Sequence, residues 1–163
     1  MTLQETIALT QQAYELRLQG KLDLARRALE PLLDLTPPPA VALILMAECL
    51  QQSDDGETEE IGLLLRQGAR LSPNCPDAQL ELAHFIFAWL DENDEARSLL
   101  SDARKLISQA NLSADLLEAA LLRDEGRVED AVQLLSRTAA TYPNSGLVRE
   151  ELKSLRALLD ASG

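Results

Sequence analysis

The stretch Gly20-Lys21-Leu22-Asp23-Leu24-Ala25 decides the fold, because its residue types return as Gly126-Arg127-Val128-Glu129-Asp130-Ala131 near the other end of the chain. Four small or helix-breaking residues keep one spacing of 7, 5 and 12 positions in both places: Ala13, Gly20, Ala25 and Pro37, then Ala119, Gly126, Ala131 and Pro143. Such agreement indicates an internal repeat, and a repeat determines the whole architecture.

Two more degenerate copies lie between these. Each of the four copies has a small residue at the corresponding position, namely Ala13, Ala47, Ala83 and Ala119, and successive positions are 34, 36 and 36 residues apart. Ile61 stands where the second copy should have alanine, and Ser108 stands where the third should have proline. A period of this length is typical of stacked helix pairs.

Each copy predicts two helices, since leucine and alanine recur at intervals of three and four residues. Thr2-Leu3-Gln4-Glu5 is typical of a capping box, Gly20 should break the first pair, and Pro37-Pro38-Pro39 should end its second helix. We expect the later helices at 40–50, 59–71, 77–90, 94–107, 113–123 and 128–141. A ninth, at 146–159, has a polar outer face suited to a capping helix.

Over residues 6–143 the pattern resembles the tetratricopeptide repeat family, although leucine replaces most family aromatics. The residues that match the family pattern are Leu9, Gln12-Ala13, Leu16, Ala25, Leu29 and Pro37, with their counterparts in the other copies. The resemblance implies an all-α solenoid of antiparallel helix pairs, a right-handed superhelix of about nine helices. We expect one domain over 1–163, with repeats at about 6–39, 40–75, 76–110 and 111–144 and a capping helix at about 146–160.

Composition agrees with an all-helical chain and narrows the class of partner. Of 163 residues, 46% are apolar and only 3% aromatic, so the strong helix formers leucine and alanine dominate. The net charge of −12 disfavours nucleic acid and anionic membranes as partners, because both present phosphates that need a basic surface. A basic protein partner, or solubility alone, explains the charge better.

Cys49 and Cys75 form no CxxC motif, which predicts reduced thiols and no metal or disulfide framework. The N-terminal residues do not resemble a secretory signal, and the longest apolar run, 40–47, is shorter than the ~20 residues that span a bilayer. We therefore expect a cytoplasmic protein without a cofactor. His84 is the only histidine, and no nucleophile or phosphate-loop motif is present, so an enzyme is disfavoured.

In the family, first helices line a concave groove that holds peptides or partner helices. The resemblance places eight residues in that groove: Tyr14, Arg17, Glu48, Gln51, His84, Phe87, Ala120 and Arg123. The alternative is that they are ordinary half-exposed helix residues. Some family members bind a C-terminal carboxylate with basic side chains. The matching positions of this chain are not basic, and they are occupied by Thr10, Tyr14, Leu45, Asp77 and Glu81. That activity is not expected.

Two other surfaces are candidates. The apolar stretch at 85–90 predicts a central buried helix, or an exposed anchor at Phe87 or Trp89 for a partner or a dimer mate. Acidic residues form an edge in the turns within the pairs, and they either bind a basic partner or are only solvated: Asp54, Asp55, Glu57, Asp91 and Glu92.

The sequence thus predicts a non-enzymatic interaction module, an adaptor or assembly factor that binds another protein or peptide in its groove. A dedicated client chaperone is the first alternative, since the chain resembles in size, acidity and fold the tetratricopeptide chaperones of type III secretion translocators. A structural subunit that assembles with itself, including as a homodimer, is the second.

Overall fold

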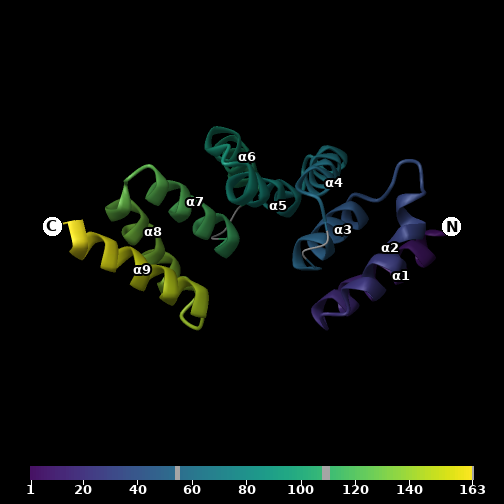
Figure 1. Cartoon of the computed structure of the whole chain (residues 1–163), viewed down its shortest axis with the longest axis horizontal. Helices are drawn as coiled ribbons and strands as arrows, with labels where there is room; N and C mark the ends of the chain where they lie inside the picture. Colours follow the sequence, from purple (N-terminus) through teal and green to yellow (C-terminus); the bar gives the residue numbers. More distant parts are fainter. Residues whose placement is uncertain (54–55, 108–110, 163) are drawn as a thin grey trace.

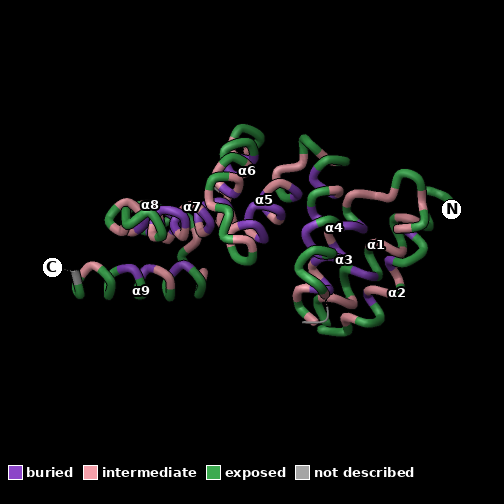
Figure 2. The backbone as a smooth tube through the Cα atoms, turned by 45° about the horizontal axis from the view of Figure 1, so that its top comes forward, coloured by how far each residue is buried: buried purple, intermediate pink, exposed green. Residues whose placement is uncertain are grey.

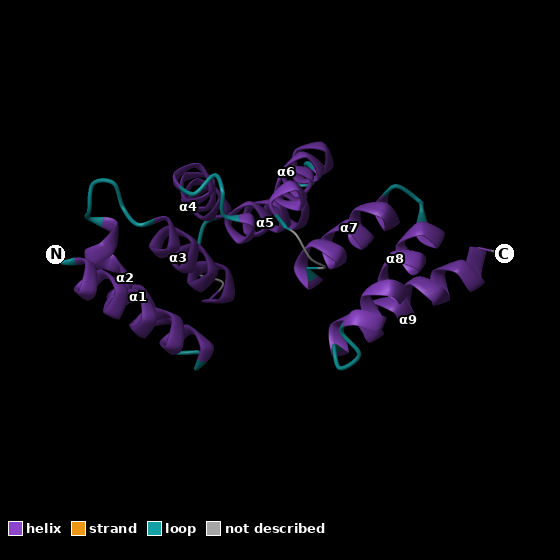
Figure 3. Ribbon diagram, turned by 180° about the vertical axis from the view of Figure 1, so that it is seen from behind, coloured by secondary structure: helices purple, strands orange, loops and turns teal. Residues whose placement is uncertain are grey.

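The computed structural model describes residues 1–53, 56–107 and 111–162. Within these ranges the chain forms helices and no strand (Figure 3). Their bounds are α1 (Leu3–Leu18), α2 (Leu22–Leu33), α3 (Ala40–Ser53), α4 (Thr58–Leu71), α5 (Pro76–Phe85), the π-helical turn η1 (Ile86–Leu90), α6 (Asn93–Leu106), α7 (Leu112–Asp124), α8 (Val128–Thr141) and α9 (Gly146–Ser162). The predicted helices are confirmed, most to within one or two residues.

Consecutive helices pack in antiparallel pairs, and the pairs follow one another along an arch whose two ends hold the two termini (Figure 1). First helices of successive pairs also contact one another, α1 with α3 and α5 with α7. The odd-numbered helices therefore share one side of the stack. This is an all-α helical-repeat solenoid.

Small residues lie where the helices cross, as the repeat spacing predicts. Alanine is fully or almost fully buried at seven such positions: Ala13, Ala25, Ala47, Ala83, Ala96, Ala119 and Ala131. Ile61, which replaces alanine in the second copy, is buried as well. Because a methyl group allows two helix backbones to approach closely, these positions set the spacing within and between pairs.

The turn within the first pair and the turn within the last pair have the same backbone geometry. Gly20 and Gly126 adopt φ values of 71° and 77°, in the left-handed region that glycine tolerates. Their N–H groups donate to Arg17 and Arg123 carbonyls, and the following residue in each turn donates five positions back. This is the Schellman arrangement, which explains why the two copies both require glycine.

The structure differs from the predicted helices in four places. The helix expected at 77–90 changes to π geometry at Ile86 and ends where Asp91 adopts a φ of 55°. Helix α2 ends at Leu33, before the prolines, since Leu35 already donates to the Leu32 carbonyl in a tight turn. Helices α3 and α9 each continue three residues beyond their predicted ends, to Ser53 and Ser162. The capping box between Thr2 and Glu5 is confirmed.

The core consists of two clusters that meet at α7. Leu117 and Leu121 belong to the cluster that extends from α1 to α7, whereas Ala119 and Leu122 belong to the cluster that α7 forms with α8 and α9. Figure 2 shows the buried residues between the helices and exposed residues along their outer faces. Helix α9 buries Val148, Leu152 and Leu155 against its neighbours.

Candidate protein-binding groove

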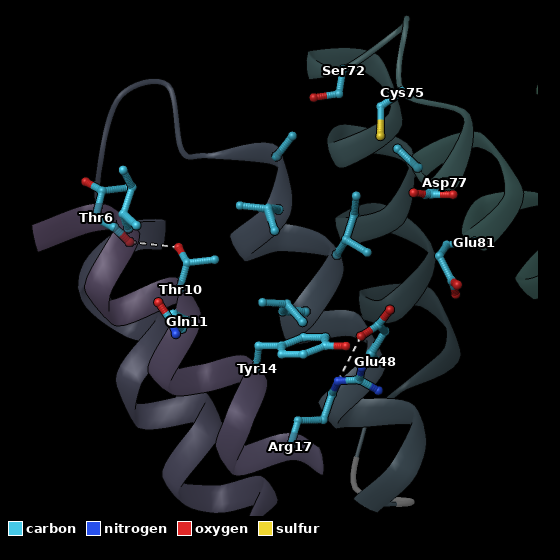
Figure 4. Close-up of a pocket in the computed structure, with 16 residues that line it drawn as sticks. Thr6, Thr10, Gln11, Tyr14, Arg17, Glu48, Ser72, Cys75, Asp77 and Glu81 are labelled. Carbon is cyan, nitrogen blue, oxygen red and sulfur yellow. Dashed lines mark hydrogen bonds and ion pairs between the residues drawn. The ribbon is translucent and has the colours of Figure 1, made fainter. Parts of the chain in front are cut away.

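A cavity of about 650 Å³ opens between α1, α3 and the start of α5, and we call it the N-terminal groove (Figure 4). Its apolar surface comes from Ile7, Val41, Ile44, Leu45 and Ala78, among others. Ile7 and Val41 have 55% and 46% of their surface exposed, which is high for branched aliphatic residues. The groove therefore presents apolar side chains to solvent.

Helical periodicity explains why these side chains share one surface. Ile7, Thr10, Tyr14 and Arg17 follow one another on α1 at intervals of three and four residues, so they form one face of that helix. Val41, Ile44 and Glu48 do the same on α3, and Asp77 and Glu81 on α5. Packing of α1 on α3 and of α4 on α5 turns these faces toward one cavity.

Arg17 and Glu48 form an ion pair at one end of the groove (Figure 4). Arg17 Nε lies 3.0 Å from Glu48 Oε2, and each side chain has 17% of its surface exposed. The two atoms are buried and their geometry is not that of an aligned hydrogen bond, so the contact is chiefly coulombic. The Arg17 guanidinium also lies 5.4 Å from the centre of the Tyr14 ring, within the range of a cation–π contact.

Two carboxyl groups of the groove are harder to ionise than usual. Burial raises the pKa of Glu48, and the charge of Arg17 lowers it only in part. Burial also raises the pKa of Glu81, with a further increase from the negative charge of Glu48. Partial removal from water thus disfavours the ionised form of both carboxyl groups.

Three of the predicted groove residues line the cavity, namely Tyr14, Arg17 and Glu48. All five positions matched to the carboxylate-gripping family members line it too, so Thr10, Leu45, Asp77 and Glu81 join them. The positions matched to that carboxylate-binding site therefore lie together in one cavity, and none of them is basic. The sequence pattern did not predict a role for the exposed apolar residues Ile7 and Val41. The only hint in the sequence was that each is an aliphatic residue on the predicted groove face.

Other predicted groove residues contact neighbouring helices. His84 Nε2 lies 2.8 Å from the Ser113 hydroxyl, which links α5 to α7, and burial lowers the pKa of His84. Phe87 packs against the first core cluster, and Gln51 and Ala120 are half-buried away from the cavity. Arg123 Nη1 donates to Glu151 of α9 at 3.0 Å.

The remaining predicted surfaces stay predictions. Trp89, in the π-helical turn, is 55% exposed. Glu57, Asp91 and Glu92 are exposed in turns, and Glu92 is 4.0 Å from Arg66. Asp54 and Asp55 lie outside the described residues.

The described residues contain neither a candidate membrane span nor a candidate metal cluster. None of the helices there combines the length and apolar character that a membrane span requires. In the same part of the chain, no group of three or more histidine, cysteine, aspartate and glutamate side chains could hold a metal ion. Cys49 is buried and Cys75 half-buried, and both are free thiols.

Comparison with known proteins identifies the fold. No protein-family model and no curated protein matches the sequence. Among solved structures, PilF of Pseudomonas aeruginosa aligns at a TM-score of 0.72 and 20% identity over 90% of this chain and 64% of that one. This chain thus spans less than two thirds of that PilF structure.

Two further structures are described as tetratricopeptide repeat proteins. TTC0263 of Thermus thermophilus aligns at a TM-score of 0.75 and 19% identity, over 92% of this chain and 80% of that one. A protein from Parabacteroides merdae aligns at a TM-score of 0.74 and 17% identity, over 93% of this chain and 58% of that one. At such low identities the likeness concerns the fold alone. The chain has a tetratricopeptide-repeat-like fold.

Proposed function

We propose that this chain is a non-enzymatic adaptor or assembly factor that holds a segment of a partner protein in the N-terminal groove. The observation that carries the proposal is the cavity of about 650 Å³ whose apolar side chains, led by Ile7 and Val41, are exposed to solvent. Exposed apolar residues gathered in a concave surface are typical of interaction sites. In this proposal the four helix pairs and α9 form a single domain, and the protein is located in the cytoplasm.

The mechanism follows from the distribution of polar and apolar groups along the groove. Apolar side chains of the partner would be buried against Ile7, Val41 and Ile44, and burial of such surface drives association. Tyr14 and Thr10 lie along the same face of α1. The Tyr14 hydroxyl can donate or accept a hydrogen bond, and the Thr10 hydroxyl, which already donates to the Thr6 carbonyl, can accept one, so that both can fix the register of the bound segment.

Site-specific photo-cross-linking in cells tests the proposal. A photoreactive amino acid at Val41 should cross-link to one partner, whereas the same group at Leu24, which is 49% exposed and does not line the groove, should not. Equal cross-linking from both positions, or none from Val41, would count against the groove as the binding site.

The cross-linked products also distinguish this proposal from the two alternative functions, a client chaperone and a self-assembling subunit. A client chaperone would give one abundant partner that is unfolded when this chain is absent. A self-assembling subunit would give cross-links between copies of this chain. An adaptor would give a folded partner of different sequence.

A further inference from the structure

The N-terminal groove has more carboxylates than cations. Among the described residues that line it, Glu48, Asp77 and Glu81 can carry negative charge, and Arg17 alone carries positive charge. Arg17 is already engaged by Glu48 and by the Tyr14 ring. In the described part of the chain, Asp77 and Glu81 form no ion pair with a cation.

Several carboxylates between the repeats are paired with arginine, in contrast to Asp77 and Glu81 of the groove. Glu95 pairs with Arg66, Glu125 with Arg97, and Glu151 with Arg123, each pair joining residues from different helix pairs or from the last pair and α9. This chain therefore satisfies its acidic residues with arginine where helix pairs meet. The side chains of Asp77 and Glu81 face the open cavity instead (Figure 4).

An unpaired carboxylate in these surroundings costs free energy. Glu81 is half-buried, and its desolvation, together with the charges of Glu48 and Asp77, makes ionisation unfavourable. A positive group that reached Glu81 would remove much of this cost, because hydrogen bonds between ionised partners are stronger than neutral ones.

The surface around these carboxylates restricts which cation fits. Val41, Ile44 and Ala78 lie beside them in the same cavity, so a small hydrated ion would leave that apolar surface uncovered. Lysine and arginine combine a charged head with an aliphatic stem, and the stem can cover apolar surface.

We infer that the groove selects a polypeptide segment in which a lysine or arginine is flanked by apolar residues, with the cation held by Asp77 and Glu81. The flanking side chains would contact Ile7, Val41 and Ile44. This inference rests on the proposed function and adds the chemical class of the partner. It is supported by the charge complementarity between such a segment and a groove with excess carboxylates.

Selection from a random peptide library displayed on phage tests the inference with the full chain. The parent should enrich peptides that carry lysine or arginine at a fixed position between apolar residues. The double variant Asp77→Asn/Glu81→Gln, which leaves the Arg17–Glu48 pair intact, should enrich apolar peptides without that basic residue. Glu59→Gln removes an exposed carboxylate of α4 outside the groove and should select the same peptides as the parent.

One selected peptide, made synthetically, then gives the size of the effect. Its dissociation constant should rise about tenfold for the double variant, as expected for loss of a charge-assisted contact, and remain unchanged for Glu59→Gln. Peptides without a basic residue, bound equally by parent and double variant, would overturn the inference and leave the proposed function intact. Peptides that still bind after Ile7→Glu, or no enriched peptide at all, would contradict the proposed function itself.

A second copy of this chain is the competing occupant, because α9 has exposed basic residues at Arg149, Lys153 and Arg156. Light scattering of the parent decides between them. A monomer supports a separate partner. A dimer that dissociates in Asp77→Asn/Glu81→Gln would overturn the assignment to a separate partner.

Discussion

Arg123 of α7 lies 3.0 Å from Glu151 of α9, 28 positions further along the chain. Arg97 of α6 pairs with Glu125, 28 positions later at the end of α7, and Arg66 of α4 pairs with Glu95 of α6, 29 positions later. These pairs form a ladder between successive repeats. Arg123, which the family resemblance places in the groove, thus joins α7 to α9.

Arg104 should contribute more to stability than the arginines of this ladder. Arg104 Nη2 lies 2.8 Å from Asp115 and 2.5 Å from Glu118, and Asp115 is buried and also accepts from the Thr138 hydroxyl. Arg104→Met would leave the Asp115 carboxylate without its cation, so we expect a loss of about 1–3 kcal/mol in unfolding free energy. Urea denaturation measures it.

Arg97→Met is the control for Arg104, since the Arg97–Glu125 pair is exposed and should contribute less than about 1 kcal/mol. Equal losses in the two variants would contradict the prediction that Arg104 contributes more to stability than an exposed ion pair.

The alanines at the helix crossings should not accept a large side chain. Ala25→Trp and Ala131→Trp each place an indole where no surface is exposed, and overpacking should destabilise the fold by about 1–3 kcal/mol or more. Thermal denaturation compares them with Ala8→Trp, at an exposed position of α1. Melting temperatures of the two core variants equal to that of the parent would contradict the helix-pair packing.

Glu81→Gln should stabilise the protein at neutral pH. Because burial raises the pKa of Glu81 in the folded state, its contribution to stability is fully present below its ordinary pKa of 4.5 and is lost as pH rises through the folded value. The variant should therefore melt at a higher temperature than the parent at pH 7, and the difference should shrink as pH falls toward 4.5. A melting temperature below that of the parent at pH 7 would be inconsistent with a costly carboxylate.

His84 should give the opposite pH dependence. Burial lowers its pKa in the folded state, so its favourable contribution is present above the ordinary pKa of 6.5 and is lost as pH falls through the folded value. As the only histidine, it gives one imidazole C2 proton resonance in an NMR titration. The midpoint should lie below 6.5, and Ser113→Ala, which removes the nearby hydroxyl, tests how that contact influences it. A midpoint above 6.5 would contradict the burial of His84.

Features fixed by local backbone requirements could be predicted from the sequence. Gly20 and Gly126 mark turns with positive φ, Thr2 with Glu5 marks a helix start, and the alanines mark close crossings. The change to π geometry at Ile86 could not, because a helix that is apolar on all sides contains no signal for an altered hydrogen-bond register. The location of the groove depends on how α1, α3 and α5 are spaced, which is a tertiary property.

Binding of a selected peptide to Ile7→Glu tests the central claim most directly. Ile7 is 55% exposed in the groove, so a glutamate there should disturb the bound segment more than the fold. The matched control is Leu24→Glu, at an exposed leucine of α2 outside the groove. The account predicts a dissociation constant raised at least tenfold in Ile7→Glu and unchanged in Leu24→Glu. Equal affinity of the two variants and the parent would contradict it.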